Sequence, residues 1–135
     1  MTDRVATPLG VVATAGQTHE SMSFECLMDT VKVRSRRRPD AVAGDKGYSY
    51  PRIRRWLRRR GIEVVIPTRR NQPRERLNRV KYRGRNAVER CIGWLKNCRR
   101  IATRYDRLAI HFVAFVKLAV IQHCLKLWDP SNRTY

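Results

Sequence analysis

The residues best suited to chemistry lie at two places in the chain, an aspartate after a short apolar run and a row of polar residues farther along. The aspartate is Asp45, and the row consists of Tyr82, Arg85, Glu89 and Lys96, separated by three, four and seven residues. At about 100° per residue, these four side chains project from a helix as one stripe beside its apolar face. Glu89 could therefore face Asp45. Two carboxylates suit a Mg²⁺ ion that also binds a substrate phosphate.

The same spacing also fits a simpler role for the row. Arg85 and Lys96 flank Glu89 at helical intervals, which is the pattern of a solvent-exposed series of ion pairs worth roughly a few tenths of a kcal/mol each. On spacing alone, the ion-pair row is favoured over a metal ligand. Both interpretations remain open at this level.

Three predicted elements would hold Asp45 in place. Residues 41–44 form a small apolar run typical of a short buried strand, and residues 62–66 are typical of a second strand. Between them, Ser49 is the predicted N-cap of a helix that begins near Pro51, carries an apolar stripe and ends at Gly61. A strand, a helix and a strand with short joints predict a parallel pair with a right-handed crossover. Asp45 then follows the carboxyl end of its strand, where open α/β sheets usually place their chemistry.

The other segments alternate between strand and helix patterns. Residues 8–15 predict a strand, and a helix is expected around residues 24–31, capped by Ser21 or Thr18. Residues 69–81 are rich in Arg and lack apolar periodicity, which predicts an exposed loop or arm. From residue 85 a helix is predicted with Val88, Ile92, Leu95 and Cys98 on its apolar face. The last helix, over residues 110–128, is apolar on most sides and is expected to be buried.

The chain is strongly basic, with 30 Lys and Arg against 11 Asp and Glu and a net charge of +19. Residues 32–107 hold 26 of the basic residues and only six acids, so the charge is concentrated in the middle of the chain. Of the basic residues 24 are Arg, whose planar guanidinium suits phosphate oxygens. The balance argues against an ordinary metabolic enzyme and predicts a nucleic acid partner. Within this region, Arg54 and Arg58 are predicted to contact DNA.

The cysteines and the apolar stretches indicate a reduced, cytoplasmic protein. Cys26, Cys91, Cys98 and Cys124 have no CxxC spacing and form no zinc-ligand pattern with the three histidines, so they are predicted to be small, mostly buried side chains. The apolar stretch 108–128 is interrupted by polar residues such as Lys117 and His123. It is therefore predicted to be a core helix and not a membrane span.

Three strings of the sequence resemble one protein family. GDKGYSYPRIRRWLRRRGIEVVIPTRRNQ is followed by YRGRNAVERCIGWLKNCRRIATRYDRLAIHFVAFVKLA, and PLGVVATAGQTHES precedes both. Together they are similar to the carboxyl-terminal half of the DDE transposases of bacterial insertion sequences. Tyr82, Arg85, Glu89 and Lys96 match that family's Tyr, Arg, Glu, Lys signature at every spacing, and Asp45 matches its second catalytic Asp.

The resemblance implies an α/β, ribonuclease H-like fold in which residues 1–135 form a single catalytic domain with carboxyl-terminal helices. It implies that Asp45 and Glu89 bind Mg²⁺ or Mn²⁺, while Tyr82, Arg85 and Lys96 position transposon-end DNA near the scissile phosphate. The implied reaction is phosphodiester hydrolysis at the transposon ends, followed by strand transfer to target DNA. The implied setting is a homo-oligomer in the cytoplasm, associated with the nucleoid and not with a membrane.

The chain departs from the family pattern at its start. The family's first catalytic Asp lies on a strand that precedes the PLGVVATAG segment, and only seven residues precede Pro8. Asp3 is the one acid among them, but its place corresponds to a turn, so it is not assigned as catalytic. We therefore expect a truncated domain without the first strand, inactive by itself or completed by an upstream transposase fragment.

Two other functions compete with this expectation. The composition alone also predicts a non-catalytic basic nucleic-acid-binding protein, and a decayed transposase remnant would have no activity. Asp45 and Glu89 separate these possibilities, because catalysis requires their carboxylates within a few ångströms of a shared metal, whereas DNA binding does not.

Overall fold

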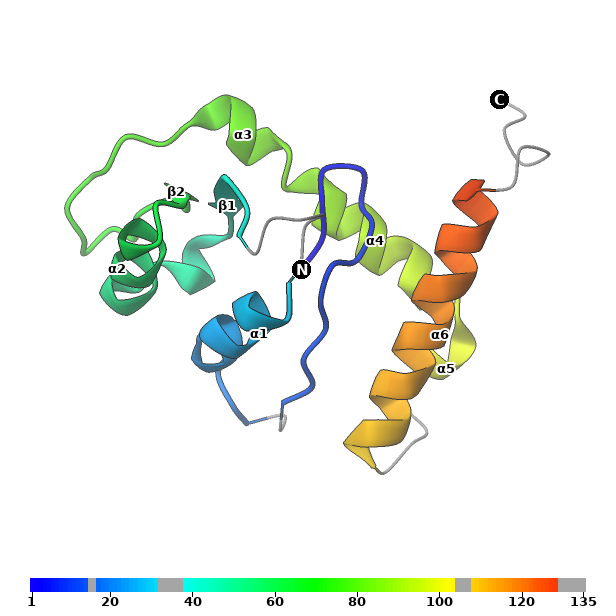
Figure 1. The fold of residues 1–135 in the computed structure, drawn as a ribbon. Helices are drawn as coiled ribbons and strands as arrows, with labels where there is room; N and C mark the ends of the chain where they lie inside the picture. The colour runs from blue at the N-terminus through cyan, green and yellow to red at the C-terminus, as the bar shows by residue number, and fades with distance from the viewer. Residues whose placement is uncertain (15–16, 32–37, 104–107, 129–135) are drawn as a thin grey trace.

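The computed structural model describes residues 1–14, 17–31, 38–103 and 108–128 (Figure 1). After a short 3₁₀ turn, η1 (Glu20–Ser23), the elements are α1 (Phe24–Thr30), β1 (Ala41–Ala43), a second turn η2 (Lys46–Tyr48), α2 (Pro51–Arg59), β2 (Glu63–Val65), α3 (Arg79–Arg83), α4 (Asn86–Lys96), α5 (Arg99–Ala102) and α6 (Ala109–Trp128). Helices with a small parallel sheet agree with the predicted α/β class.

The predicted strand–helix–strand unit is confirmed. β1 pairs with β2 in parallel, with Val42 opposite Val64, and α2 makes the crossover between them. Pro51 occupies the first turn of α2, as predicted, because its missing N–H has no partner to lose there. The chain leaves α2 through Gly61, whose φ of +65° is a left-handed conformation that favours glycine. The N-cap is Tyr50 and not Ser49.

The main core lies between the sheet and the helices α1 and α2. It is formed by the buried residues Phe24, Met28, Val42, Ile53, Leu57, Ile62 and Ile66. Ile53 and Leu57 come from one face of α2 and are fully buried, so burial of this face holds the crossover helix against the sheet. The arrangement fixes the loop after β1, where Asp45 lies.

The N-terminal segment forms a second, smaller core with α4. Ala6 packs with Ala87 and Cys91, and Trp94 and Leu95 pack against them. Residues 8–14 are not a strand, so that prediction is wrong for the described part. They make a single antiparallel bridge, from Pro8 to Thr2. A β-branched run becomes a strand only where a neighbouring strand offers a full ladder of hydrogen bonds, and none of the described segments lies beside it in that way.

Two predicted helix features differ in detail. Neither Ser21 nor Thr18 caps the first helical segment. The side chain of His19 caps η1 by accepting a hydrogen bond from the Ser21 N–H, and Ser23 precedes α1 without a side-chain cap. The helix predicted from residue 85 is separated from α3 by Gly84 and Arg85.

The apolar face of α4 is also displaced from the predicted one. Ala87 and Cys91 are its buried residues, whereas Ile92 is 46% exposed. The N-terminal segment packs on the stripe next to the predicted one, about 100° around the helix. Periodicity alone did not show which of these two stripes would be buried. Cys98 is half-buried, while Cys26 and Cys124 are exposed, so the prediction of mostly buried cysteines holds for half of them. All four are free thiols.

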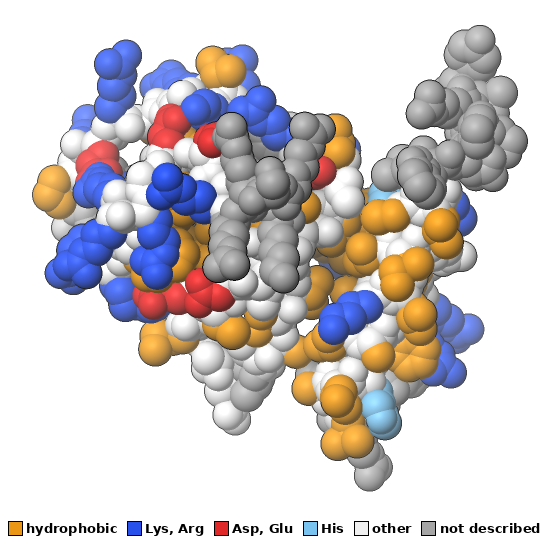
Figure 2. All heavy atoms as spheres, viewed as in Figure 1, with side chains coloured by type: hydrophobic (Ala, Val, Ile, Leu, Met, Phe, Trp, Pro, Cys, Tyr) orange, Lys and Arg blue, Asp and Glu red, His pale blue; other side chains and the backbone are white. Residues whose placement is uncertain are grey.

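α6 is a helix as predicted, but the prediction that it is buried is wrong. It packs on α4 and α5 through Val116, Ala119 and a stack of His123 on Trp94 with ring centroids 4.0 Å apart. Its opposite face is solvent-exposed, and Figure 2 shows hydrophobic side chains along it. The helices α4 and α5 cover only one side of α6. Because the sequence of α6 is apolar on most sides, its other side exposes apolar residues to solvent. By length and composition alone, residues 109–126 could also cross a membrane.

Candidate functional site

Asp45 lies two residues past Ala43, the carboxyl end of β1, as predicted, and its side chain is exposed. It caps the η2 turn, because its Oδ1 accepts a 2.7 Å hydrogen bond from the Gly47 N–H. A Cβ at position 47 would lie 2.8 Å from that oxygen, so glycine there allows the close approach. The described contacts leave Oδ2 of Asp45 available to a ligand.

Asp45 shares an open pocket of about 340 Å³ with residues from the η1 turn. The lining consists of Gln17, Thr18, His19, Glu20, Ser21, Asp45, Gly47 and Tyr48. Two carboxylates, Asp45 and Glu20, therefore border one cavity on a chain that is otherwise strongly basic. His19 has the capping role that its place in a turn suggests, and its ring is nearly perpendicular to that of Tyr50, with ring centroids 5.6 Å apart.

Tyr48 also lines this pocket and contacts one of its two carboxylates. Its hydroxyl donates to Glu20 Oε2 over 3.3 Å. Burial first, and then the nearby charges of Glu20 and Asp45, raise the pKa of Tyr48 to about 12. Tyr48 is therefore protonated at physiological pH and keeps donating to Glu20.

Glu89 lies on α4 and is involved in a different contact. Arg85 donates to Glu89 Oε1 at 2.7 Å, and its guanidinium lies 6.0 Å from the Tyr82 ring. Three of the four residues of the predicted stripe thus lie together, although Tyr82 belongs to α3. Lys96 is exposed on the last turn of α4, with no contact to these three among the described residues. The Arg85–Glu89 contact is the ion pair that the spacing favoured.

The structure places no α4 residue on the lining of the Asp45 pocket. Glu89, with a side chain 61% exposed, is outside it. In the part of the chain that the structure describes, no three His, Cys, Asp or Glu residues form a group able to hold a metal ion. Asp45 and Glu20 are the carboxylates that the described fold brings to one cavity.

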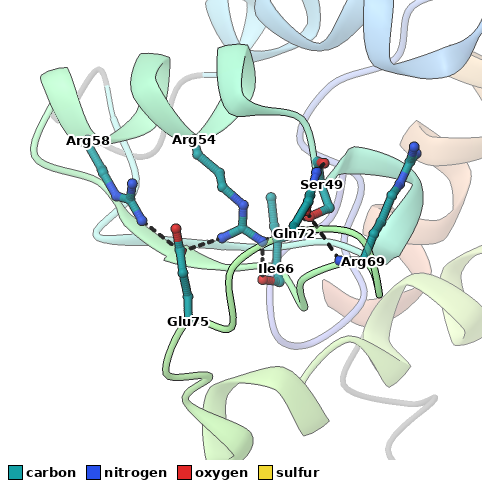
Figure 3. A network of polar contacts seen from close by, with 7 residues as sticks. All are labelled: Ser49, Arg54, Arg58, Ile66, Arg69, Gln72 and Glu75. Atoms are coloured by element: carbon teal, nitrogen blue, oxygen red, sulfur yellow. Dashed lines mark hydrogen bonds and ion pairs between the residues drawn. The ribbon is translucent and has the colours of Figure 1, made fainter.

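Arg54 is an internal residue of this fold and not a surface contact. It is 6% exposed, and its guanidinium donates to Glu75 at 2.7 Å, to Ser49 Oγ at 3.0 Å and to the Ile66 carbonyl at 2.8 Å. Arg58 donates to the same Glu75 oxygen at 2.7 Å, so the two arginines share one carboxylate (Figure 3). The Arg58 hydrogen bond, foremost, holds the pKa of Glu75 below its ordinary value.

The same network fastens the loop after β2 to the loop after β1. Gln72 donates to the Ser49 carbonyl and accepts from Ser49 Oγ, both at 2.6 Å (Figure 3). Arg69 donates to the carbonyls of Lys46 and Gly47, next to Asp45. The basic segment predicted as an exposed loop or arm is therefore anchored at its beginning, and its last residues enter α3.

Sequence reasoning missed the residues that organise these loops, above all Glu75 and Gln72. Glu75 carried a usable signal, because it is the one acid between Glu63 and Glu89 in a stretch full of arginine. A lone acid in such a stretch is expected to form an ion pair with one or more of the surrounding arginines. Gln72 had no comparable signal, since its role depends on Ser49 from a distant segment.

Comparison with known proteins agrees with the resemblance seen in the sequence. The family model described as "Transposase DDE domain" matches residues 1–122. A Burkholderia cepacia protein, described as a candidate transposase for insertion sequence element IS402, is 34% identical over 139 residues, covering 98% of this chain. The chain spans 63% of the length of that relative. No solved structure matches the chain. The chain therefore belongs to the transposase DDE domain family of insertion sequences.

Proposed function

We propose that this chain acts in DNA transposition, by binding DNA and by contributing Asp45 and Glu89 to a metal-dependent phosphodiester reaction at transposon ends. The observation that carries the proposal is the placement of Asp45. An exposed carboxylate at the carboxyl end of a parallel strand, in a pocket with Glu20 on a chain of net charge +19, suits a site where an anionic substrate meets a cation.

The metal in this proposal is Mg²⁺ or Mn²⁺, which prefers carboxylate oxygens. Asp45 supplies such an oxygen, but Glu89 lies outside its pocket, and the described residues contain no group of three metal-binding side chains. These residues by themselves do not make a two-metal site. The proposal requires at least one further carboxylate from outside the described residues, for which an upstream fragment is a natural source.

The chain's own residues have separate roles in the proposal. Arg85 holds Glu89 at 2.7 Å and neutralises its charge on the free protein. A phosphate arriving beside Arg85 would compete for this guanidinium, because guanidinium pairs with phosphate as readily as with carboxylate. That exchange would release Glu89. Tyr82 beside Arg85, and Lys96 farther along α4, would extend the contact with transposon-end DNA.

A non-catalytic DNA-binding protein, or a decayed remnant, is the second candidate. The observation that favours it is the Arg85–Glu89 ion pair, which gives Glu89 a structural partner and needs no metal. Metal binding distinguishes the two. A site at Asp45 should bind Mn²⁺ in the wild-type chain and lose it in Asp45→Asn, whereas a pure DNA-binding protein shows no such difference.

The test of the proposal is cleavage of a labelled insertion-sequence end in Mg²⁺ or Mn²⁺. The chain is measured alone and together with the amino-terminal segment of its longer relative, supplied as a separate polypeptide. We expect no cleavage by the chain alone, because its described residues do not bring together a full set of metal-binding carboxylates. We expect metal-dependent nicking when the segment is added.

Three substitutions interpret that assay. Asp45→Asn and Glu89→Gln should each abolish the restored nicking, while Asp29→Asn, a change of an exposed acid on α1, should leave it intact. Metal-dependent nicking by the chain alone that disappears in both site variants would show that the chain has a complete site. Restored nicking that persists in Asp45→Asn would remove the role assigned to Asp45.

The remaining features of the proposal concern the setting of the reaction. The proposed partners are transposon-end and target DNA, and the complete protein is proposed to act as a homo-oligomer. We place it in the cytoplasm at the nucleoid, because its charge suits a polyanion there.

A further inference from the structure

The arginines of α2 differ sharply in their partners. The segment PRIRRWLRRR, which consists of α2 and the residue that follows it, contains six arginines. Arg52 pairs with Glu25, and Arg54 and Arg58 share Glu75. The guanidinium of Arg60 lies 3.7 Å from the centre of the Trp56 ring. Four of the six are therefore engaged with the protein itself.

Arg55 and Arg59 are the two that remain. Both are exposed, and neither pairs with an acid among the described residues. Arg55 makes one weak contact, from Nε to the carbonyl of Pro51 at 3.4 Å in its own helix. Glu25 and Glu75 neutralise arginines on the two flanks of the exposed face, which leaves an unneutralised strip between them.

The position of this pair on α2 makes it available to a large ligand. Arg55 and Arg59 are four residues apart, so they lie on the same face about 6 Å apart along the helix axis. That face is opposite to the one that buries Ile53 and Leu57. Two like charges at this spacing repel each other, and a polyanion that lies across both removes the repulsion. Figure 2 shows Lys and Arg side chains gathered over this part of the molecule.

We infer that Arg55 and Arg59 form a phosphate-contacting strip on α2 that holds the backbone of duplex DNA. The inference rests on the proposed function and specifies it, by placing the contact on Arg55 and Arg59 of α2 and not on Arg54 and Arg58. Guanidinium groups bind phosphate oxygens in a bidentate manner, and a helix held by its buried face presents two of them at a fixed spacing. Contacts of this kind position DNA without reading its sequence.

The test compares Arg55→Gln/Arg59→Gln with a matched control, Lys117→Gln/Lys126→Gln, which removes two exposed charges from α6. Affinity for a short fluorescent DNA duplex is measured over a range of salt concentrations. Each phosphate contact contributes about 0.9 to the slope of log affinity against log salt, so the α2 variant should lose about two units of slope. The control should keep the wild-type slope. Circular dichroism on heating should show the same unfolding midpoint for both.

Two further variants make the interpretation specific. Arg55→Lys/Arg59→Lys keeps the charge and should keep most of the slope, with an affinity several-fold lower because an ammonium cannot bind in a bidentate manner. Arg54→Gln/Arg58→Gln should reduce the unfolding midpoint.

The possible failures are distinct. A wild-type chain with no salt-dependent DNA binding would overturn the DNA-binding part of the proposed function as well as this strip. Wild-type binding with a normal slope that Arg55→Gln/Arg59→Gln leaves unchanged would overturn only the strip. An equal loss of slope in the α6 control would also overturn the assignment of a phosphate contact to Arg55 and Arg59.

Discussion

At the scale of single residues, the arginines show that charge and function are not the same thing. The residues 54 and 58 were predicted as DNA contacts from composition, yet Arg54 is buried and shares Glu75 with Arg58. Replacing Arg54 and Arg58 would therefore disturb the fold before it reported on DNA. A buried guanidinium needs its hydrogen-bond acceptors, because an unpaired buried charge is strongly unfavourable.

We predict that Glu75→Gln lowers the free energy of unfolding by about 1–2 kcal/mol at neutral pH. The substitution removes the carboxylate shared by Arg54 and Arg58 and leaves Arg54 buried with fewer acceptors. The figure stays modest because the Glu75 side chain is 37% exposed. Urea unfolding measures the change. Glu25→Gln is the control, since its pair with Arg52 is exposed on both sides and should contribute less than about 0.5 kcal/mol.

The pH dependence of this difference has a definite sign. The pKa of Glu75 is lowered in the folded state, so the unfolded chain binds its proton more readily. The stability from Glu75 is fully present above its ordinary pKa of 4.5 and is lost as the pH falls through the lowered folded value. The gap between wild type and Glu75→Gln should therefore close in acid. A gap that widens in acid would contradict the role of the carboxylate.

At the scale of elements, α6 departs most from expectation. Its exposed apolar residues Ile110, Leu118, Ile121 and Leu125 are 55–73% exposed. They recur at intervals of eight, three and four, so they line one stripe, and Ala114 lies in the same stripe. Periodicity and hydrophobicity showed that this segment is a helix. They did not show which of its sides would be covered.

We predict that Leu118→Gln/Leu125→Gln reduces self-association of the purified chain and changes its stability by no more than about 0.5 kcal/mol. Both side chains are exposed, so the substitutions remove exposed apolar surface that promotes association and remove little buried contact. Light scattering and urea unfolding measure the two effects. Val116→Ala, on the buried side, should instead lower stability by about 1–3 kcal/mol. If the double substitution unfolds the chain, the stripe is buried against other apolar surface in solution, and the prediction is wrong.

At the scale of the whole molecule, the charge dominates. A net charge of +19 on 135 residues makes the folded chain repel itself. The sheet offers little compensation, since β1 and β2 pair only with each other among the described strands. Ligands that bind the folded state stabilise it by mass action, and a polyanion also reduces the repulsion.

We predict that duplex DNA raises the thermal unfolding midpoint of the chain at low salt and that the increase disappears at high salt. Salt screens the phosphate contacts and lowers the entropy gained when bound counterions leave the DNA, so the effect must shrink as salt rises. Thermal melts with and without DNA, over several salt concentrations, measure it. An increase of the same size at high salt would indicate a ligand held by something other than charge.

The sequence by itself determined the local elements and the family. The β1–α2–β2 unit, the position of Asp45 after its strand, and the helices α4 and α6 follow from short-range periodicity and from Pro51 and Gly61, which act through their own backbone preferences. The signature from Tyr82 to Lys96 and the segments around it were enough to identify the transposase DDE domain, because they depend only on residue identity and spacing.

Only the tertiary structure decided which side chains meet. Glu20 lies in the same pocket as Asp45, and Glu75 pairs with both Arg54 and Arg58. The buried face of α4 lies next to the predicted one, and one side of α6 is exposed. Each of these outcomes depends on contacts between segments far apart in the chain. The free energy of a contact depends on which partner arrives and how much water it excludes, and a single segment's sequence does not contain that information.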